Sequence, residues 1–392
     1  MKNVMFVDDE SRILDGIRRM MYAERKRWNM EFALGGEAAL QALEAKPFDI
    51  VVTDMRMPGM DGATLLTRVR EISPITVRII LSGHTELEAA MRAIPVAHRF
   101  LAKPCNASAL REAIERTCKL QDLLNNEEIR RVVSGIAELP SSQVSFNALT
   151  ETLNDPAVTL ERLTAVIEKD MAMTAKVLQF ANSGFFGATQ VMTTVAGGVG
   201  YLGVDTIKNL ALNVKAFRVL EPHPAVLPGF WEELSSRANR TVGIINKLPL
   251  EKEALEVAVV AGFLHDIGDL IAAGYIPEIF AGMLASAKEG GSKAYESEEK
   301  KLGFSHAEIG AYLLGIWGLP QPIVDAIAHH HHPTRVPHMG LDPITAVYVA
   351  DLLADGGTPA QADQDTLNEL GLAQQFAEWQ KSLPQQALAA KA

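Results

Sequence analysis

The chain has 392 residues, which is too long for one ordinary domain, so we expect two or three domains. An apolar content of 48% is ample for sizeable cores, and a net charge of −11 at pH 7 argues against general binding to nucleic acid, whose backbone needs a basic protein face. The chain has two cysteines, Cys105 and Cys118, which are too few for a disulfide framework and favour a cytoplasmic protein. Acids occur already at Asp8 and no apolar run is longer than residues 257–264, so we expect neither a signal peptide nor a membrane span.

Four short apolar runs in the first third of the chain each lead directly into polar residues. The runs are 4–7, 48–53, 77–81 and 100–102, and they are followed by Asp8 with Asp9, Asp54, Ser82 and Lys103. Short runs without alternation, separated by helix-like stretches, are typical of a parallel sheet buried on both faces. Because ligands gather beyond the carboxyl ends of such strands, we expect these side chains to meet at one edge of the sheet.

Such a meeting of side chains has a chemical meaning. Three crowded carboxylates repel one another, and a hard cation such as Mg²⁺, which prefers oxygen ligands, relieves that repulsion. A carboxylate can also attack a phosphoryl group to give an acyl phosphate, with Lys103 and Ser82 binding the phosphoryl oxygens. Alternatively, these residues are ordinary loop acids and a surface lysine. That interpretation is reasonable for any one of them, but less so for all of them together at matching strand ends.

Residues 1 to about 120 resemble the receiver domain of two-component response regulators. The resemblance rests on four motifs in order: Val7–Glu10, Val52–Gly62, Leu81–Gly83 and Phe100–Pro104. It implies a doubly wound five-stranded parallel sheet and Asp54 as the acceptor of a phosphoryl group from a sensor histidine kinase. It also implies Mg²⁺ held by Asp9, Asp54 and the Arg56 carbonyl with Asp8 assisting. Ser82 and Phe100 fall at the hydroxyl and aromatic switch positions, so we expect a receiver that can be phosphorylated.

Two helices of the receiver have recognisable starts. Ser11 is a plausible N-cap for the first helix, and the last helix should begin near Asn106. No glycine or proline interrupts the chain from Asn106 to Ser134, so we expect one extended linker helix over residues 106–138. Its amphipathic face is consistent either with signal transmission or pairing with a second copy, or with a plain, half-buried connector.

Past Pro140 the pattern becomes helical and predicts an all-α bundle of roughly 200 residues. The expected helices of its first part cover residues 149–153, 160–169, 173–182, 207–220, 231–248 and 251–264. Residues 336–392 are expected to form a C-terminal extension with one helix around residues 361–383, followed by a frayed tail.

The bundle carries several histidines and acids. They are His265 with Asp266, His306, the run at 329–332, and Asp351. Imidazole and carboxylate groups can ligate a transition metal, and an adjacent His–Asp pair can serve a hydrolytic dinuclear site. Alternatively, His265 and Asp266 bind helix termini in the core, and the histidine run is a solvated loop.

Residues 139 to about 335 resemble the HDOD domain, a relative of metal-dependent HD phosphohydrolases. The resemblance rests on Leu139–Pro140, Phe180–Gly187, Gly200–Gly203, Phe263–Gly268, Gly303–Gly310, Trp317–Pro320 and Ala328–Pro333. It implies a signalling output through protein contacts, and loss of hydrolytic activity as in most members.

The chain departs from the active HD enzymes in three places. No histidine occurs in Trp231–Arg237, where the first metal ligand should fall, and Asp269 replaces a common lysine. His332–Thr334 stands where the hydrolases of cyclic di-GMP carry Gly-Tyr-Pro. Much of the later ligand set remains, namely His265, Asp266, His306, His330 or His331, and Asp351, and Glu233 could substitute for the missing ligand. We therefore expect Mg²⁺ at the receiver and favour a bundle without a transition metal.

Three functions remain in view. We favour a response regulator whose non-catalytic bundle contacts a downstream signalling protein. The alternative is a phosphorylation-gated, metal-dependent phosphodiesterase of a cyclic dinucleotide, and a weaker third is a metal or redox sensor. We expect neither DNA nor a membrane as a partner, and the linker helix makes a homodimer plausible.

Overall fold

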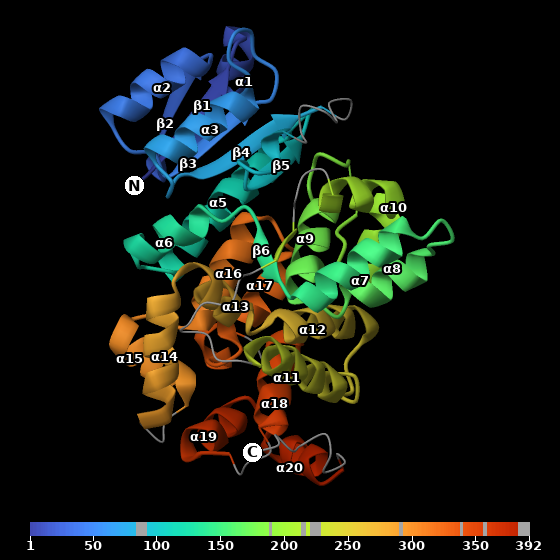
Figure 1. Cartoon of the computed structure of the whole chain (residues 1–392). Coiled ribbons are helices and arrows are strands. Elements are labelled where there is room, and N and C mark those ends of the chain that lie inside the picture. Colours follow the sequence, from blue (N-terminus) through green and yellow to red (C-terminus); the bar gives the residue numbers. More distant parts are fainter. Residues whose placement is uncertain are drawn as a thin grey trace.

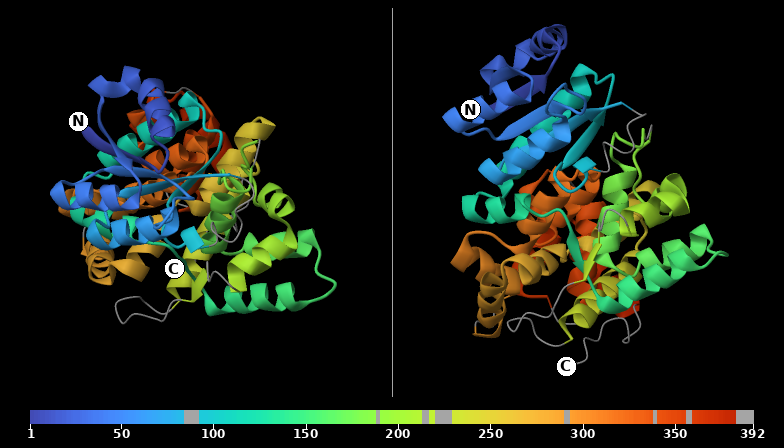
Figure 2. Two further views of the ribbon diagram at one scale, coloured as in Figure 1. Left: turned by 90° about the horizontal axis from the view of Figure 1, so that it is seen from above. Right: turned by 45° about the horizontal axis from the view of Figure 1, so that its top comes forward.

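The structure, a computed structural model, describes residues 1–83, 92–187, 190–212, 217–219, 229–289, 293–337, 340–355 and 359–382. A sheet domain at the N-terminus lies against one end of a helical bundle (Figure 1). Both views of Figure 2 place the green helices of the bundle to one side of its orange and red centre. The predicted fold class, an α/β receiver followed by an all-α bundle, is confirmed.

The receiver is built on a five-stranded parallel sheet with the strand order β2-β1-β3-β4-β5. Its strands are β1 (Lys2–Asp8), β2 (Trp28–Leu34), β3 (Ile50–Asp54), β4 (Val77–Ser82) and β5 (Arg99–Ala102). Its helices are α1 (Ser11–Met20), the 3₁₀ turn η1 (Tyr22–Lys26), α2 (Gly36–Ala45), α3 (Gly62–Ile72) and α5 (Ala107–Leu123). The segment between β4 and β5 lies largely outside the described residues. The predicted strands are mostly apolar and lack alternation because helices cover both faces of the sheet.

The two predicted helix starts have different outcomes. Asn106 caps α5, because its side chain accepts a hydrogen bond from the Ala109 N–H at 2.8 Å. Ser11 is not a cap: it is the first residue of α1, and Glu10 holds the cap position without a side-chain bond. The Asp8 carboxylate already accepts from the Glu10 N–H at 2.9 Å, so the turn before α1 is held from the end of β1 instead.

The prediction of one continuous linker helix is wrong. Helix α5 ends at Leu123, and a separate α6 (Glu127–Ser134) follows. Leu124 leaves the helical region with φ −92 and ψ 77, and the Asn126 side chain accepts from the Ile129 N–H at 3.0 Å to cap α6. Asparagine favours helix caps over helix interiors, so the break needs neither glycine nor proline.

The bundle contains a small sheet and fourteen described helices, besides one 3₁₀ turn. In chain order they are β6 (Leu139–Ser141), α7 (Gln143–Asn154), α8 (Leu160–Ile167), α9 (Met171–Ala181), α10 (Val195–Leu212), β7 (Phe217–Val219), α11 (Phe230–Ile245), α12 (Lys252–Leu264), α13 (Ile267–Tyr275), α14 (Pro277–Glu289), α15 (Ala294–Leu302), α16 (His306–Ile316), α17 (Gln321–His329), η2 (Pro333–Arg335), α18 (Pro343–Ala354), α19 (Gln361–Glu369) and α20 (Ala373–Ser382).

Three predictions for the bundle need correction. The helix expected over residues 207–220 ends at Leu212, because residues 217–219 form β7 and pair with β6 in parallel. Helix α18, expected to be part of an extension, packs against α11, α12 and α17 in the core. The single tail helix is two, α19 and α20, since Gly371 has a φ of +70, which ends α19; residue 383 lies outside the described residues.

Among the described residues, one helical stretch, Lys252–Tyr275, is long and apolar enough to cross a membrane. Its most apolar window is 83% buried within the bundle, which accounts for its composition as that of a core helix.

Candidate functional site

The carboxyl edge of the receiver sheet brings the predicted acids together. Carboxylate oxygens of Asp8, Asp9 and Asp54 lie within 4.8 Å of one another. The Lys103 Nζ, just after β5, lies 2.6 Å from Asp54 Oδ1 and 3.5 Å from Asp8 Oδ2. The edge therefore gathers three carboxylates and one ammonium, as the strand ends predicted.

Burial shapes the chemistry of this acidic cluster. Desolvation raises the pKa of Asp8, and Asp8 Oδ2 is buried without a hydrogen-bond donor of good geometry. A buried oxygen in that state, next to two further carboxylates, fits a hard divalent cation. Arg56 lies two residues beyond Asp54 in the loop before α3, where its carbonyl is expected to contribute.

The loop that follows Asp54 is held close to the strand end by a glycine. A Cβ on Gly62 would lie 2.2 Å from the Asp54 carbonyl oxygen, so only glycine permits this approach of α3 to β3. The Asp54 side chain is fixed as well, since Oδ1 accepts from the Met55 N–H at 2.8 Å.

The two predicted switch residues lie on neighbouring strands. Ser82 ends β4, is buried, and donates from its hydroxyl to the Gly83 carbonyl at 3.2 Å. Phe100 on β5 is 5% exposed, and its ring packs against Phe185 of the bundle with centroids 6.1 Å apart. The aromatic switch position therefore lies at the contact between the two domains.

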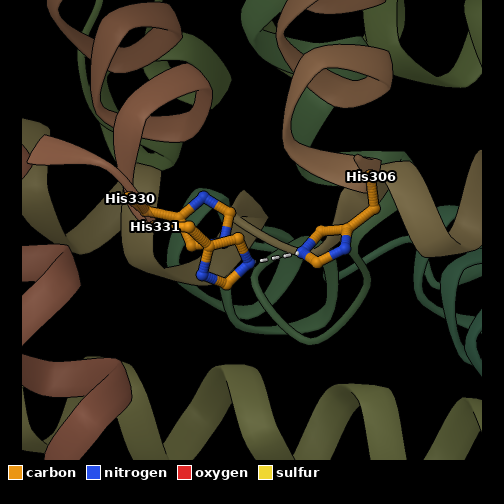
Figure 3. Close-up of side chains that lie close together, drawn as sticks. All are labelled: His306, His330 and His331. Atoms are coloured by element: carbon orange, nitrogen blue, oxygen red, sulfur yellow. Dashed lines mark hydrogen bonds between the residues drawn. The ribbon is translucent and has the colours of Figure 1, made fainter. Parts of the chain in front are cut away.

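The histidines and acids predicted in the bundle also converge. They come from the ends of α12 and α16, from the segment after α17 and from α18: His265, Asp266, His306, His330, His331 and Asp351. Figure 3 shows His306 facing His330 and His331 across the bundle core, with His306 Nε2 and His331 Nε2 3.0 Å apart.

Backbone carbonyls orient two of these imidazoles. His265 Nδ1 donates to the Gly262 carbonyl at 2.8 Å and His330 Nδ1 donates to that of Ile327 at 2.7 Å, because a carbonyl can only accept. Both Nε2 atoms therefore face the cluster: that of His330 is buried without a hydrogen-bond partner, and that of His265 lies 3.3 Å from Asp266 Oδ2 and 3.4 Å from Asp351 Oδ1. Metal-binding histidines are oriented in the same manner.

The chain supplies its own cation at Asp266. Arg237 Nη1 on α11 lies 2.8 Å from Asp266 Oδ2, whose side chain is 2% exposed. Burial opposes ionisation of Asp266, but the charges of Arg237 and His265 outweigh it and hold its pKa well below the usual value. Asp266, with further acids behind it, raises the pKa of Arg237 in turn.

Sequence reasoning missed Arg237 and named Glu233 as a substitute ligand instead. Glu233 is exposed, whereas Arg237, one helical turn further along α11, faces Asp266. The available signal was a basic residue inside the segment where a metal ligand was expected.

His306 carries a second positive charge into the cluster. Its Nδ1 donates to Glu298 Oε2 at 2.9 Å, and Nε2 faces both His331 and, at 3.4 Å, Asp266. Burial disfavours the imidazolium, but Glu298 and Asp269 outweigh it and hold the pKa of His306 well above its usual value. Glu298 was also missed, and it carried no sequence signal of this role.

These charges decide how well the bundle cluster suits a metal. The buried Nε2 atoms of His265 and His330 favour one, but Arg237 neutralises Asp266 and His306 donates through both ring nitrogens. A cavity of about 190 Å³ beside the cluster is also lined by Arg237 and Lys293. Arg237 and His306 would therefore compete with a metal ion for Asp266, although ligand atoms of His265, Asp266 and His330 lie within 4.8 Å of one another.

Comparison with family models assigns both parts of the chain. The model of the response regulator receiver domain matches residues 4–115, and that of the HDOD domain matches residues 139–333.

Comparison with individual proteins gives partial matches. An uncharacterized protein of Treponema pallidum is 25% identical over 230 residues, 58% of this chain and 44% of its own length. The DNA-binding transcriptional regulator NtrC of Escherichia coli is 33% identical over 125 residues, 29% of this chain and 24% of its own length. The chain thus spans less than half of these curated relatives. The crystal structure of the response regulator MmoQ from Methylococcus capsulatus superposes with a TM-score of 0.48 at 22% identity, covering 64% of this chain and 98% of that one.

Proposed function

The chain is a response regulator-type signalling protein with a receiver domain and an HDOD domain, and we propose that it acts as a phosphorelay switch with a non-catalytic output. In this proposal Asp54 accepts a phosphoryl group from a histidine kinase in the cytoplasm. The bundle then passes the signal on by binding a downstream protein.

One observation carries the proposal for the receiver: the Lys103 ammonium lies 2.6 Å from Asp54 within a cluster of three carboxylates. An Asp54 carboxylate oxygen attacks the phosphorus of a phosphohistidine, and the P–N bond breaks as the P–O bond forms. The imidazole keeps the electron pair and takes a proton from water, while Lys103 holds the phosphoryl oxygens. Mg²⁺ held by Asp8, Asp9, Asp54 and the Arg56 carbonyl would neutralise the charge that gathers on those oxygens.

Acetyl phosphate with Mg²⁺ tests the proposal for the receiver. We expect the full-length protein to gain one phosphoryl group, located at Asp54 by mass spectrometry after borohydride trapping, and we expect Asp54→Asn to gain none. Glu44→Gln, which changes an exposed acid on α2, is the matched control and should be labelled like the wild type. Label on other acids only would contradict the assignment.

The Arg237–Asp266 ion pair supports a non-catalytic output, because the carboxylate of the His–Asp pair is already neutralised. The buried Nε2 atoms of His265 and His330, which both face the cluster, are the observation that favours the second candidate, a metal-dependent phosphodiesterase of a cyclic dinucleotide. Incubation of the phosphorylated protein with Mn²⁺ and a cyclic dinucleotide separates the two. Turnover that is lost in His265→Ala would establish the enzyme, whereas no turnover agrees with the non-catalytic output.

A further inference from the structure

A loop of the bundle pairs with the free edge of the receiver sheet. This docking loop, residues 182–187, follows α9, and the Gly184 N–H donates to the Phe100 carbonyl of β5 at 2.9 Å. Strand β5 is the last in the sheet order, so the loop covers backbone groups that an edge strand leaves open. Figure 1 shows the green helices around α9 beside β4 and β5.

The contact leaves no room for a side chain at its centre. A Cβ on Gly184 would lie 2.5 Å from the Ala102 nitrogen and 2.8 Å from the Leu101 Cα, which are backbone atoms that cannot turn away. Glycine is therefore required at position 184 by the docking of one domain on the other.

Hydrogen bonds within the bundle hold the docking loop in shape. The Asn182 side chain accepts from the Met192 N–H at 2.8 Å and donates to the Met192 carbonyl at 2.8 Å. The Ser183 hydroxyl donates to the Phe180 carbonyl at 2.8 Å. The loop therefore meets β5 as a preformed surface and adapts little to a shift of the strand.

The strand segment under the loop carries the groups that respond to phosphate. Phe185 is 5% exposed and packs on Phe100. Ala102 directly precedes Lys103, whose N–H donates to the Ser82 carbonyl at 2.9 Å and whose ammonium binds Asp54. A phosphoryl group on Asp54 would therefore bind Lys103, which directly follows the docked backbone of Ala102, and Ser82, which pairs with Ala102 from the neighbouring strand.

We propose that the docking loop is a positioning element of the phosphorylation site, and that it holds β5 and Lys103 in the arrangement suited to unmodified Asp54. This inference rests on the proposed function and deepens it. The backbone at Gly184 packs closely against Leu101 and Ala102, directly before Lys103, so a shift of β5 with Lys103 towards a phosphoryl group would loosen the contact. Because coupling between two sites is reciprocal, the docked bundle opposes phosphorylation and phosphorylation opposes docking.

The experiment compares four full-length proteins: wild type, Gly184→Ala, Phe185→Ala and Gly200→Ala. Gly200→Ala is the matched control, since a Cβ there meets nothing within 4 Å. Two quantities are measured, the affinity for the phosphoryl analogue beryllofluoride with Mg²⁺, and the rate of labelling of Asp54 by acetyl phosphate.

We expect Gly184→Ala and Phe185→Ala to bind beryllofluoride about five-fold or more tightly and to label faster, with Gly200→Ala equal to the wild type. Structural damage alone would weaken binding, so a gain separates positioning from misfolding, and Phe185→Ala serves if Gly184→Ala does not fold. Equal or weaker binding in both variants would overturn this inference and leave the proposed function intact. Failure of all four proteins to label would overturn the proposed function.

Discussion

At the scale of single residues, the bundle cluster depends on Arg237. Helix α11 carries this guanidinium to the position where its cation neutralises a buried carboxylate. The sequence predicted that His265, Asp266 and Asp351 lie close together, because their residue types and the family motif indicated a shared site. It could not show that a basic residue would complete the site, since an ion pair across helices depends on tertiary packing.

Removing the Arg237 charge should destabilise the bundle. We expect Arg237→Gln to lower the free energy of unfolding by about 2 kcal/mol, less than for a fully unpaired buried charge because His265 and His306 still face Asp266. Urea denaturation measures this loss. Arg240→Gln on the same helix is the control: its guanidinium bonds only the Ser236 hydroxyl among the contacts described, so its loss should stay within about 1 kcal/mol. Similar losses in both variants would count against the role of the Arg237–Asp266 pair.

The buried side chain of Lys176 should make the stability of the folded protein depend on pH. Its ammonium lies 3.7 Å from the Trp317 ring centroid and donates to Gln179 Oε1 at 2.9 Å, and burial lowers its pKa from 10.5 to about 7. Between these two values the unfolded chain binds more protons than the folded one, so folded stability rises with pH across that window. Below pH 7 both states hold the proton and the dependence disappears.

The variant Lys176→Met isolates this contribution. From pH 7.5 to pH 9 the wild type should gain up to about 1.4 kcal/mol per pH unit relative to the variant. The measurement is the difference in free energy of unfolding between the two proteins in urea at each pH. A difference that stays constant, or that moves the other way, would show that Lys176 remains charged in the folded protein.

At the scale of elements, α16 joins the domain contact to the histidine cluster. His306 begins this helix, and near its other end Tyr312 OH lies 2.8 Å from Ser134 Oγ of α6. A Cβ on Gly315 would lie 2.4 Å from a Leu120 methyl of α5, so the two helices meet closely. The apolar face of α5, predicted to serve either transmission or a plain connector, is thus covered by the same chain.

Gly315 tests how tightly these helices pack. We expect Gly315→Ala to lose about 1–3 kcal/mol of stability by overpacking against Leu120. Gly243→Ala, in the last turn of α11 with nothing within 4 Å of the new Cβ, should gain up to about 1 kcal/mol instead. Thermal and urea unfolding of both variants give the comparison, and a gain in Gly315→Ala would show that α5 moves away at no cost.

The sequence predicted elements well where an apolar run marks a buried strand, and less well at helix ends and where pairing partners decide. Buried apolar runs located four of the five receiver strands, all except β2, and Asn106 marked a true helix start. The linker break at Leu124 was missed, because Asn126 was not weighed as a cap inside an uninterrupted helical pattern. Strand β7 was missed because it exists only by pairing with β6.

At the scale of the whole molecule, the two domains share their apolar interior. One buried cluster joins receiver residues such as Phe6 and Ile79 to bundle residues such as Tyr312, and a second joins Phe100 to Phe185. Arg116 adds a polar tie by donating to the Leu319 carbonyl at 2.7 Å. Such contacts are absent from any sequence pattern, which is why Gly184 was predicted only as part of a family motif. A homodimer that pairs through the apolar face of α5 would require the bundle to move away from that face.

Hydrogen exchange of the full-length protein, with and without beryllofluoride and Mg²⁺, tests the central claim most directly. If the change at Asp54 reaches the bundle, beryllofluoride should speed amide exchange in residues 182–187 and in β5 of the wild type, while Asp54→Asn shows no change. Changes confined to the acidic edge of the receiver, with residues 182–187 protected as before, would contradict the account.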